Sequence, residues 1–111
     1  MKDIEKKLTF ADFLLSQGDA KIYASAAFKH VLSAATLLVK ELTDLDENSI
    51  NSPQIIKQTL KRFKDSNADD FAKFYINLLS LSAKPTISVS DIEDLVRRTR
   101  GFVNWVQNQK F

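Results

Sequence analysis

The chain has 111 residues, of which 44% are apolar and 27% charged, a balance typical of one globular domain. It contains no cysteine, which excludes disulfides and thiolate metal sites, and its net charge of +2 is small for a dedicated nucleic-acid binder. Only two glycines and two prolines occur, which favours long helices over a turn-rich β fold. We therefore expect one all-α domain over residues 1–111, an up-and-down bundle of four to five helices.

The first predicted helix runs from about Asp3 to Gln17 and carries one apolar stripe, formed by Ile4, Leu8, Ala11 and Leu15. Gly18 and Asp19 follow as a C-cap and the N-cap of the next helix, and together they predict a tight helical hairpin.

The second predicted helix, from Ala20 to about Thr43, is polar only on a narrow sector of Ser25, Lys29, Ser33, Thr36 and Lys40. Most other positions are apolar, including Ile22 and Tyr23, so neighbours are expected to cover it on two or three sides. This helix is the predicted centre of the bundle.

Three shorter helices are expected after a polar connection over residues 44–52. Ser52 and Pro53 are a predicted N-cap and first residue of a helix to about Lys64, with Ile56, Leu60 and Phe63 inward. A cap at Ser66-Asn67 opens a helix to about Leu81, whose inward residues are Phe71, Phe74, Tyr75 and Leu78. Pro85 ends that segment, and a capping box over residues 90–93 opens the last helix, with Ile92, Leu95, Val96, Thr99, Val103 and Val106 on one face.

The sequence predicts a cytoplasmic protein with no membrane segment. Its longest nearly apolar run, from Val31 to Val39, is too short to span a bilayer. The N-terminal residues mix charges and lack the apolar stretch of a signal peptide.

Few side chains are suited to catalysis or metal binding. His30 is the single histidine, and we expect a half-buried ring with one hydrogen-bond partner rather than a base or a metal ligand. Asp44, Asp46 and Asn48 match the first ligands of a calcium loop, but the twelfth position is Ile55 instead of glutamate. We predict a solvated loop, no metal, no cofactor and no catalytic residue.

Basic residues form two clusters. Lys57, Lys61, Arg62 and Lys64 lie on the third predicted long helix, and Arg97, Arg98 and Arg100 on the last. Contact with nucleotide or RNA phosphates is one interpretation, a solvated, salt-bridged surface is the second, and contact with a partner protein is the third. Favourable pairs from Glu93 to Arg97 and from Asp94 to Arg98 are expected to neutralise part of the second cluster.

Aromatic residues near the C-terminus are candidates for an interface. Phe102 and Trp105 form a stripe with Gln109 that is rotated away from the main apolar face, and Phe111 lies at the terminus. The stripe either covers a neighbouring helix or anchors a partner.

The layout resembles that of HEPN domains. Residues 11–42, ADFLLSQGDAKIYASAAFKHVLSAATLLVKEL, are similar to the opening hairpin of that family, with an alanine-spaced second helix. SPQIIKQTLKRF, residues 52–63, has the place of its short third helix, and VSDIEDLVRRTRGFVNWV, residues 89–106, resembles its closing helix. The resemblance implies a helical bundle, often dimeric, associated with nucleotides or RNA and often paired with a minimal nucleotidyltransferase in toxin–antitoxin systems.

The catalytic motif of the RNA-cleaving members is absent. It consists of an arginine followed four to six residues later by a histidine, whereas the first arginine here, Arg62, lies downstream of His30. We therefore predict a non-catalytic HEPN-like binding domain, a homodimer that engages a nucleotidyltransferase-like partner or nucleotide or RNA phosphates. The alternatives are an RNA- or nucleotide-processing enzyme that uses His30, Tyr23 and Glu41, and an architectural dimeric adaptor.

Overall fold

The computed structural model describes residues 2–17, 20–84 and 87–109, and in these ranges it is all-helical, without strands. The elements are α1 (Lys2–Leu15), α2 (Ala20–Leu42), a 3₁₀ turn η1 (Ser49–Asn51), α3 (Pro53–Lys61), α4 (Ser66–Leu81) and α5 (Val89–Asn108). The expected caps Gly18 and Asp19 and the expected break at Pro85 lie outside the described residues.

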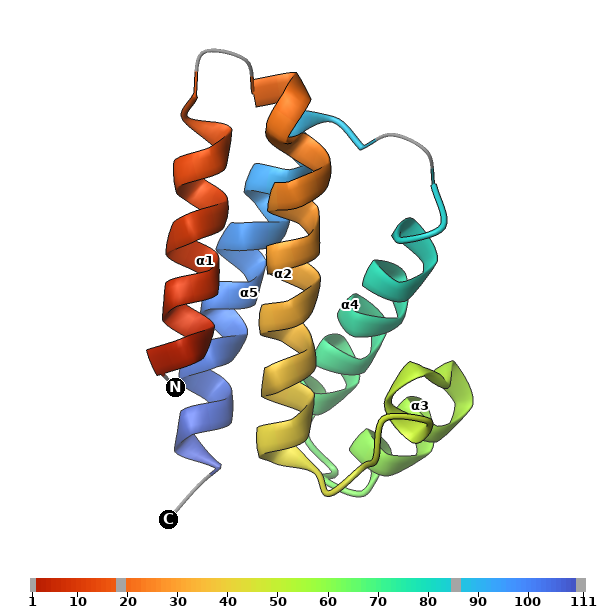
Figure 1. Ribbon diagram of the computed structural model, residues 1–111. Helices are drawn as coiled ribbons and strands as arrows, with labels where there is room; N and C mark the ends of the chain where they lie inside the picture. The colour runs from red at the N-terminus through yellow and green to blue at the C-terminus, as the bar shows by residue number, and fades with distance from the viewer. Residues whose placement is uncertain (1, 18–19, 85–86, 110–111) are drawn as a thin grey trace.

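Four long helices alternate in direction along the bundle, and the short α3 lies across one end (Figure 1). Helix α2 packs mainly against α1 and α5, and it also contacts α4 and η1. Helix α3 packs on α4 and η1. The prediction of an all-α bundle around α2 is confirmed.

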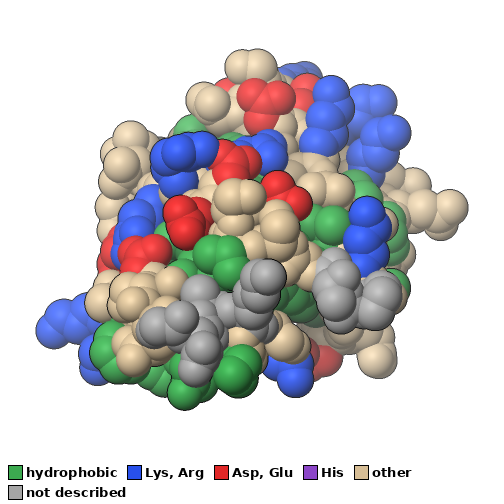
Figure 2. Space-filling view, turned by 90° about the horizontal axis from the view of Figure 1, so that it is seen from above, with side chains coloured by type: hydrophobic (Ala, Val, Ile, Leu, Met, Phe, Trp, Pro, Cys, Tyr) green, Lys and Arg blue, Asp and Glu red, His purple; other side chains and the backbone are tan. Residues whose placement is uncertain are grey.

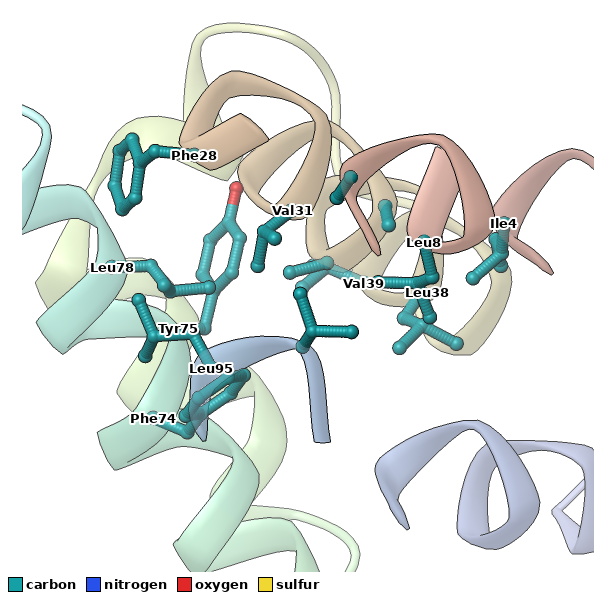
Figure 3. Packing of buried hydrophobic residues seen from close by; sticks show 14 of the residues in the cluster. Ile4, Leu8, Phe28, Val31, Leu38, Val39, Phe74, Tyr75, Leu78 and Leu95 are labelled. Carbon is teal, nitrogen blue, oxygen red and sulfur yellow. The ribbon is translucent and has the colours of Figure 1, made fainter. Parts of the chain in front are cut away.

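The core joins all the long helices through apolar side chains. Figure 3 shows Ile4 and Leu8 from α1 facing Leu38 and Val39 from α2, with residues of α4 and α5 completing the layer. Tyr75 is fully buried here, and its hydroxyl lies 3.0 Å from Thr36 Oγ1, which also donates to the Leu32 carbonyl. The predicted inward faces of α4 and α5 are confirmed, because all the residues named for them are buried.

Two predicted features of α2 are wrong at the residue level. Ile22 and Tyr23 were expected to be covered, yet they are 72% and 40% exposed. The buried stripe at the start of α2 runs through Ala24, Ala27 and Phe28 instead, and both exposed residues lie off it. Thr36 was assigned to the polar sector, but its side chain is half-buried, and its hydroxyl forms a hydrogen bond with that of Tyr75.

Several helix ends also differ from prediction. Helix α3 stops at Lys61 instead of Lys64, because the amides of residues 62–64 bond to carbonyls only three residues back, and Lys64 itself has a left-handed φ of 52°. Asp65, and not Ser66, caps α4 by accepting from the Asn67 amide at 2.9 Å. Ser88, and not Ser90, caps α5 by accepting from the Asp91 amide. The Ser52 cap of α3 with Pro53 at its first position is confirmed.

Helix α2 also satisfies a membrane criterion when it is taken alone. The segment Ile22–Leu42 is 21 residues long and apolar enough to cross a bilayer by length and composition, and it extends well beyond the nearly apolar run from Val31 to Val39. The core helix of a soluble bundle passes the same test, and α2 packs against its neighbours here.

Candidate functional site

Helix α3 borders two hollows on the surface and supplies different side chains to each. Ile56 and Leu60 point into the core and are fully buried. Lys57 and Lys61 lie one turn apart on one flank of the helix, so their side chains are neighbours. The other flank carries Ile55 and, further along, Arg62.

The first hollow is a groove of about 600 Å³ between α3 and α4, called the lysine groove below. Helix α4 contributes side chains spaced three or four residues apart, which places them on one face. The side chains that define the groove are Lys57, Lys61, Lys73, Ile76, Asn77 and Ser80. Cationic groups, one carboxylate and neutral hydrogen-bonding groups thus line a groove whose exposed surface is mostly apolar.

The three lysines of the lysine groove are not neutralised by ion pairs. Asp69 lines the same groove, but none of the ion pairs among the described residues involves Lys57, Lys61 or Lys73. The groove therefore has an excess of positive charge, and its lysine side chains are exposed to solvent. Such a site suits an anion with several oxygen acceptors.

The arginines of α5 have partners inside the protein instead. Arg97 pairs with Asp94, and Arg100 Nη1 lies 2.6 Å from Asp12 Oδ2 on α1. The guanidinium of Arg98 lies 4.8 Å from the ring centroid of Phe74. The expected pairs Glu93–Arg97 and Asp94–Arg98 are therefore wrong in detail, because Asp94 turns to the residue three positions ahead.

Those three arginines do not converge on one cavity. Arg97 and Arg100 line a shallow hollow that also contains Asp12 and Glu93, so its charges are mixed. Charges are mixed on a larger scale too, since Figure 2 shows blue and red side chains interspersed over the face seen from above. The structure brings Lys57 and Lys61 together with Lys73, and it separates them from Arg97, Arg98 and Arg100.

The second hollow is an open crevice of about 670 Å³ between the end of α2, the following loop and α3, called the apolar crevice below. Four apolar side chains line it, namely Leu42, Leu45, Ile55 and Phe63. Asp44, Gln58 and Arg62 are its polar groups, together with two threonines. Arg62 thus faces a different cavity from Lys57 and Lys61.

His30 does not line any of the three cavities described above. Its ring is half-buried and makes an edge-on contact with Phe10, with ring centroids 4.7 Å apart. No hydrogen bond to the ring occurs within the described ranges, so the expected single partner is replaced by an aromatic contact. Tyr23 is exposed near the start of α2. Among the described residues, no ion pair joins His30 to an acidic side chain.

The acidic loop after α2 has a structural role. Asp46 Oδ1 accepts from the Ser49 amide at 2.8 Å, and this bond lowers the pKa of the Asp46 carboxyl. Glu47 pairs with Lys40 of α2. No cluster of three or more metal-ligating side chains occurs in the ranges that the structure describes.

The C-terminal aromatic residues pack within the protein. Trp105 Nε1 donates to Asp65 Oδ2 at 3.2 Å, and the indole contacts Phe63 and Phe71. The Phe102 ring lies 5.0 Å from that of Phe71. The stripe therefore covers α4 and the α3–α4 turn, the first of its two predicted roles, while Phe111 lies outside the described residues.

Exposed apolar groups gather instead on the α1–α2 hairpin. Phe10 is 45% and Phe13 55% exposed, and their rings stack with centroids 6.1 Å apart. Ile22 and Tyr23 belong to the same hairpin. Exposed apolar clusters of this kind commonly mark protein-binding surfaces.

Lys73, Asn77 and Ser80 were not among the predicted binding residues. They lie on the outer side of α4, and only the packing of α3 against α4 makes them neighbours of Lys57 and Lys61. The available signal was their spacing at i, i+4 and i+7 on one helix next to a basic helix.

No family model, curated protein or solved structure gave a significant match to this chain.

Proposed function

We propose that this chain is a non-catalytic binding domain that holds phosphate groups of a nucleotide or an RNA in the lysine groove. The observation that carries the proposal is the convergence of Lys57, Lys61 and Lys73 on one cavity without an ion-pair partner among the described residues. Ammonium groups held near each other attract phosphate oxygens, and bound phosphate relieves their mutual repulsion. Asn77 and Ser80 add hydrogen-bonding groups at the same groove.

A binding role fits the lack of catalytic groups. His30 contacts Phe10 and does not line the lysine groove, whose charged groups are three lysines and Asp69. The HEPN resemblance is part of the same proposal, including a role beside a nucleotidyltransferase-like partner in a toxin–antitoxin pair. Cytoplasmic location, without membrane attachment, also belongs to the proposal and is supported by the absence of cysteine.

The test is a binding titration with a fluorescent single-stranded RNA and with a nucleoside triphosphate. The double variant Lys57→Glu/Lys61→Glu is expected to bind roughly tenfold more weakly or worse, because two attractive charges become repulsive. Fluorescence anisotropy measures the RNA affinity, and calorimetry measures that of the nucleotide.

Arg97→Glu/Arg98→Glu is the matched control, because it makes the same change of net charge on α5, outside the lysine groove. Circular dichroism must show that both variants remain helical. Equal weakening in the two variants would attribute binding to general charge and contradict the groove, and no detectable binding by the unmodified protein would remove the proposal altogether.

A second candidate function is an architectural homodimer formed through the α1–α2 hairpin. The exposed, stacked rings of Phe10 and Phe13 favour it, because a two-fold axis beside such a patch pairs it with its own copy. Two copies would cover apolar surface that one chain leaves in water.

Size-exclusion chromatography with light scattering tests the dimer. The unmodified protein is expected to have twice the monomer mass at high concentration, and Phe10→Ser/Phe13→Ser is expected to be monomeric. Ile55→Ser, which alters an exposed apolar side chain elsewhere, should not change the mass. A monomer at all concentrations would contradict this function and leave the lysine groove unaffected.

A further inference from the structure

The apolar crevice brings together apolar side chains, two opposite charges and a primary amide. Its lining is apolar, since Leu42, Leu45, Ile55 and Phe63 contribute to it. Its volume of about 670 Å³ falls in the range of cavities that hold small organic ligands. It lies on the opposite flank of α3 from Lys57 and Lys61, so its occupant is separate from the phosphate ligand proposed above.

The charges of the apolar crevice are one cation and one anion. Arg62 and Asp44 both line it, and no ion pair among the described residues joins either of them to any other residue. A ligand with a single negative charge would be attracted by Arg62 and repelled by Asp44. A ligand with one positive and one negative end satisfies both groups.

Gln58 adds a primary amide, which donates and accepts hydrogen bonds at the same time. No hydrogen bond of its side chain occurs in the described part of the structure, so its amide is available to a ligand. A peptide bond presents the matching donor and acceptor pair. Apolar side chains, an amide and two opposite terminal charges together describe a short apolar peptide.

We propose that the apolar crevice binds a short apolar peptide, with its carboxylate at Arg62, its ammonium at Asp44 and its amide at Gln58. The apolar side chains of the peptide pack against Leu42, Leu45, Ile55 and Phe63. This site is independent of the phosphate-binding proposal, since neither charged group belongs to the lysine groove.

The probe is the dipeptide Leu-Leu, compared with its N-acetylated and its C-amidated forms. Each modification removes one terminal charge and is expected to weaken binding about threefold to fivefold, the value of an exposed charge pair. Titration followed by ¹H–¹⁵N NMR measures the affinities. It also shows whether the backbone amide signals that shift on binding belong to residues 42–45 and 55–63.

Variants assign each charge to its partner. In Arg62→Gln, amidation of the peptide should no longer matter, while acetylation still weakens binding. In Asp44→Asn, the reverse is expected. Both residues are exposed, so helical content should be unchanged, and Arg62→Lys should keep most of the preference for a free carboxylate.

Three results would overturn the proposal: no binding of Leu-Leu at millimolar concentration, equal affinity for all three peptides, or shifts confined to other parts of the chain. Lys57→Glu/Lys61→Glu is the matched control and should leave peptide affinity unchanged. Loss of RNA binding in that double variant together with intact peptide binding would separate the two sites.

Discussion

Tyr75 shows how one buried polar atom is accommodated in the core. Its side chain is fully buried, and its hydroxyl meets Thr36 on α2 while the ring packs among residues of α4 and α2 (Figure 3). Burial raises the pKa of the Tyr75 phenol, because the phenolate would lose its hydration. The hydrogen bond from α4 to α2 therefore requires the neutral hydroxyl.

Tyr75→Phe is expected to lower the free energy of unfolding by about 1 kcal/mol, the net value of one hydrogen bond. Thr36 keeps its bond to the Leu32 carbonyl, so the variant leaves no hydroxyl unpaired. Chemical denaturation followed by circular dichroism gives the difference. A loss above about 3 kcal/mol would indicate a packing defect instead.

Ionisation of Tyr75 is expected to lower the free energy of unfolding at alkaline pH. A pKa raised in the folded state means that folding favours the protonated phenol, so its contribution is complete below about pH 10 and is lost as the pH rises above that value. Denaturation midpoints measured from pH 8 to pH 11 should fall less steeply in Tyr75→Phe than in the unmodified chain. Parallel pH profiles would exclude Tyr75 as the titrating group.

At the scale of single elements, the stability of α3 depends on the conformation of its two ends. It has only 9 residues, a length at which an isolated helix is marginal in water, and the Ser52 cap with Pro53 fixes its start. Its exit through Lys64 is the single non-glycine position with positive φ in the described ranges. A side chain in that conformation costs about 1–2 kcal/mol, which glycine avoids.

Lys64→Gly is therefore expected to raise the free energy of unfolding by roughly 0.5–1 kcal/mol, after the larger chain entropy of unfolded glycine is subtracted. Thermal unfolding measures the change. Gln58→Gly, at an exposed position inside α3, is the contrasting variant and should lower stability by about 1 kcal/mol. A destabilised Lys64→Gly would show that its lysine side chain makes a contribution larger than the backbone strain.

Helix positions were largely predictable because apolar spacing and caps are local signals. The inward residues of α4 and α5 follow from period 3.6 alone. The exact helix ends were harder to predict. Asp65 and Ser66 are both good caps, as are Ser88 and Ser90, and packing selects one residue of each pair. The exposure of Ile22 was not predicted, because most positions of α2 are apolar and the sequence alone does not show which stripe faces the neighbouring helices.

The candidate site was predictable only in part. Lys57 and Lys61 were recognised as neighbours because one helix carries both. Lys73 was missed because its proximity arises from the packing of α3 on α4, a tertiary contact. Arg62 was grouped with these lysines, whereas the end of α3 places it at the apolar crevice.

At the scale of the whole molecule, the net charge of +2 gives little long-range attraction for nucleic acid. Binding is expected to depend on local charge in the lysine groove. The slope of the binding constant against salt concentration gives the number of phosphates that the lysines neutralise. Three lysines on a single strand predict a slope of roughly −2 in a plot of log K against log salt concentration.

Anisotropy titrations between low and physiological salt measure that slope, and Lys73→Gln is expected to reduce its magnitude by about 0.7. A slope near zero would exclude phosphate contacts. A slope far steeper than −2 would mean that more of the surface than the lysine groove takes part.

Helix α3 is the common wall of both cavities, and it rests on α4 and η1 at one end of the bundle (Figure 1). Any tilt or partial unwinding of this helix alters both cavities at once. If a ligand in one cavity tilts or unwinds α3, it also changes the free energy of filling the other cavity, and linkage then requires this influence to be equal in both directions. Amide hydrogen exchange within residues 53–61 would report it as slower exchange when either ligand is bound.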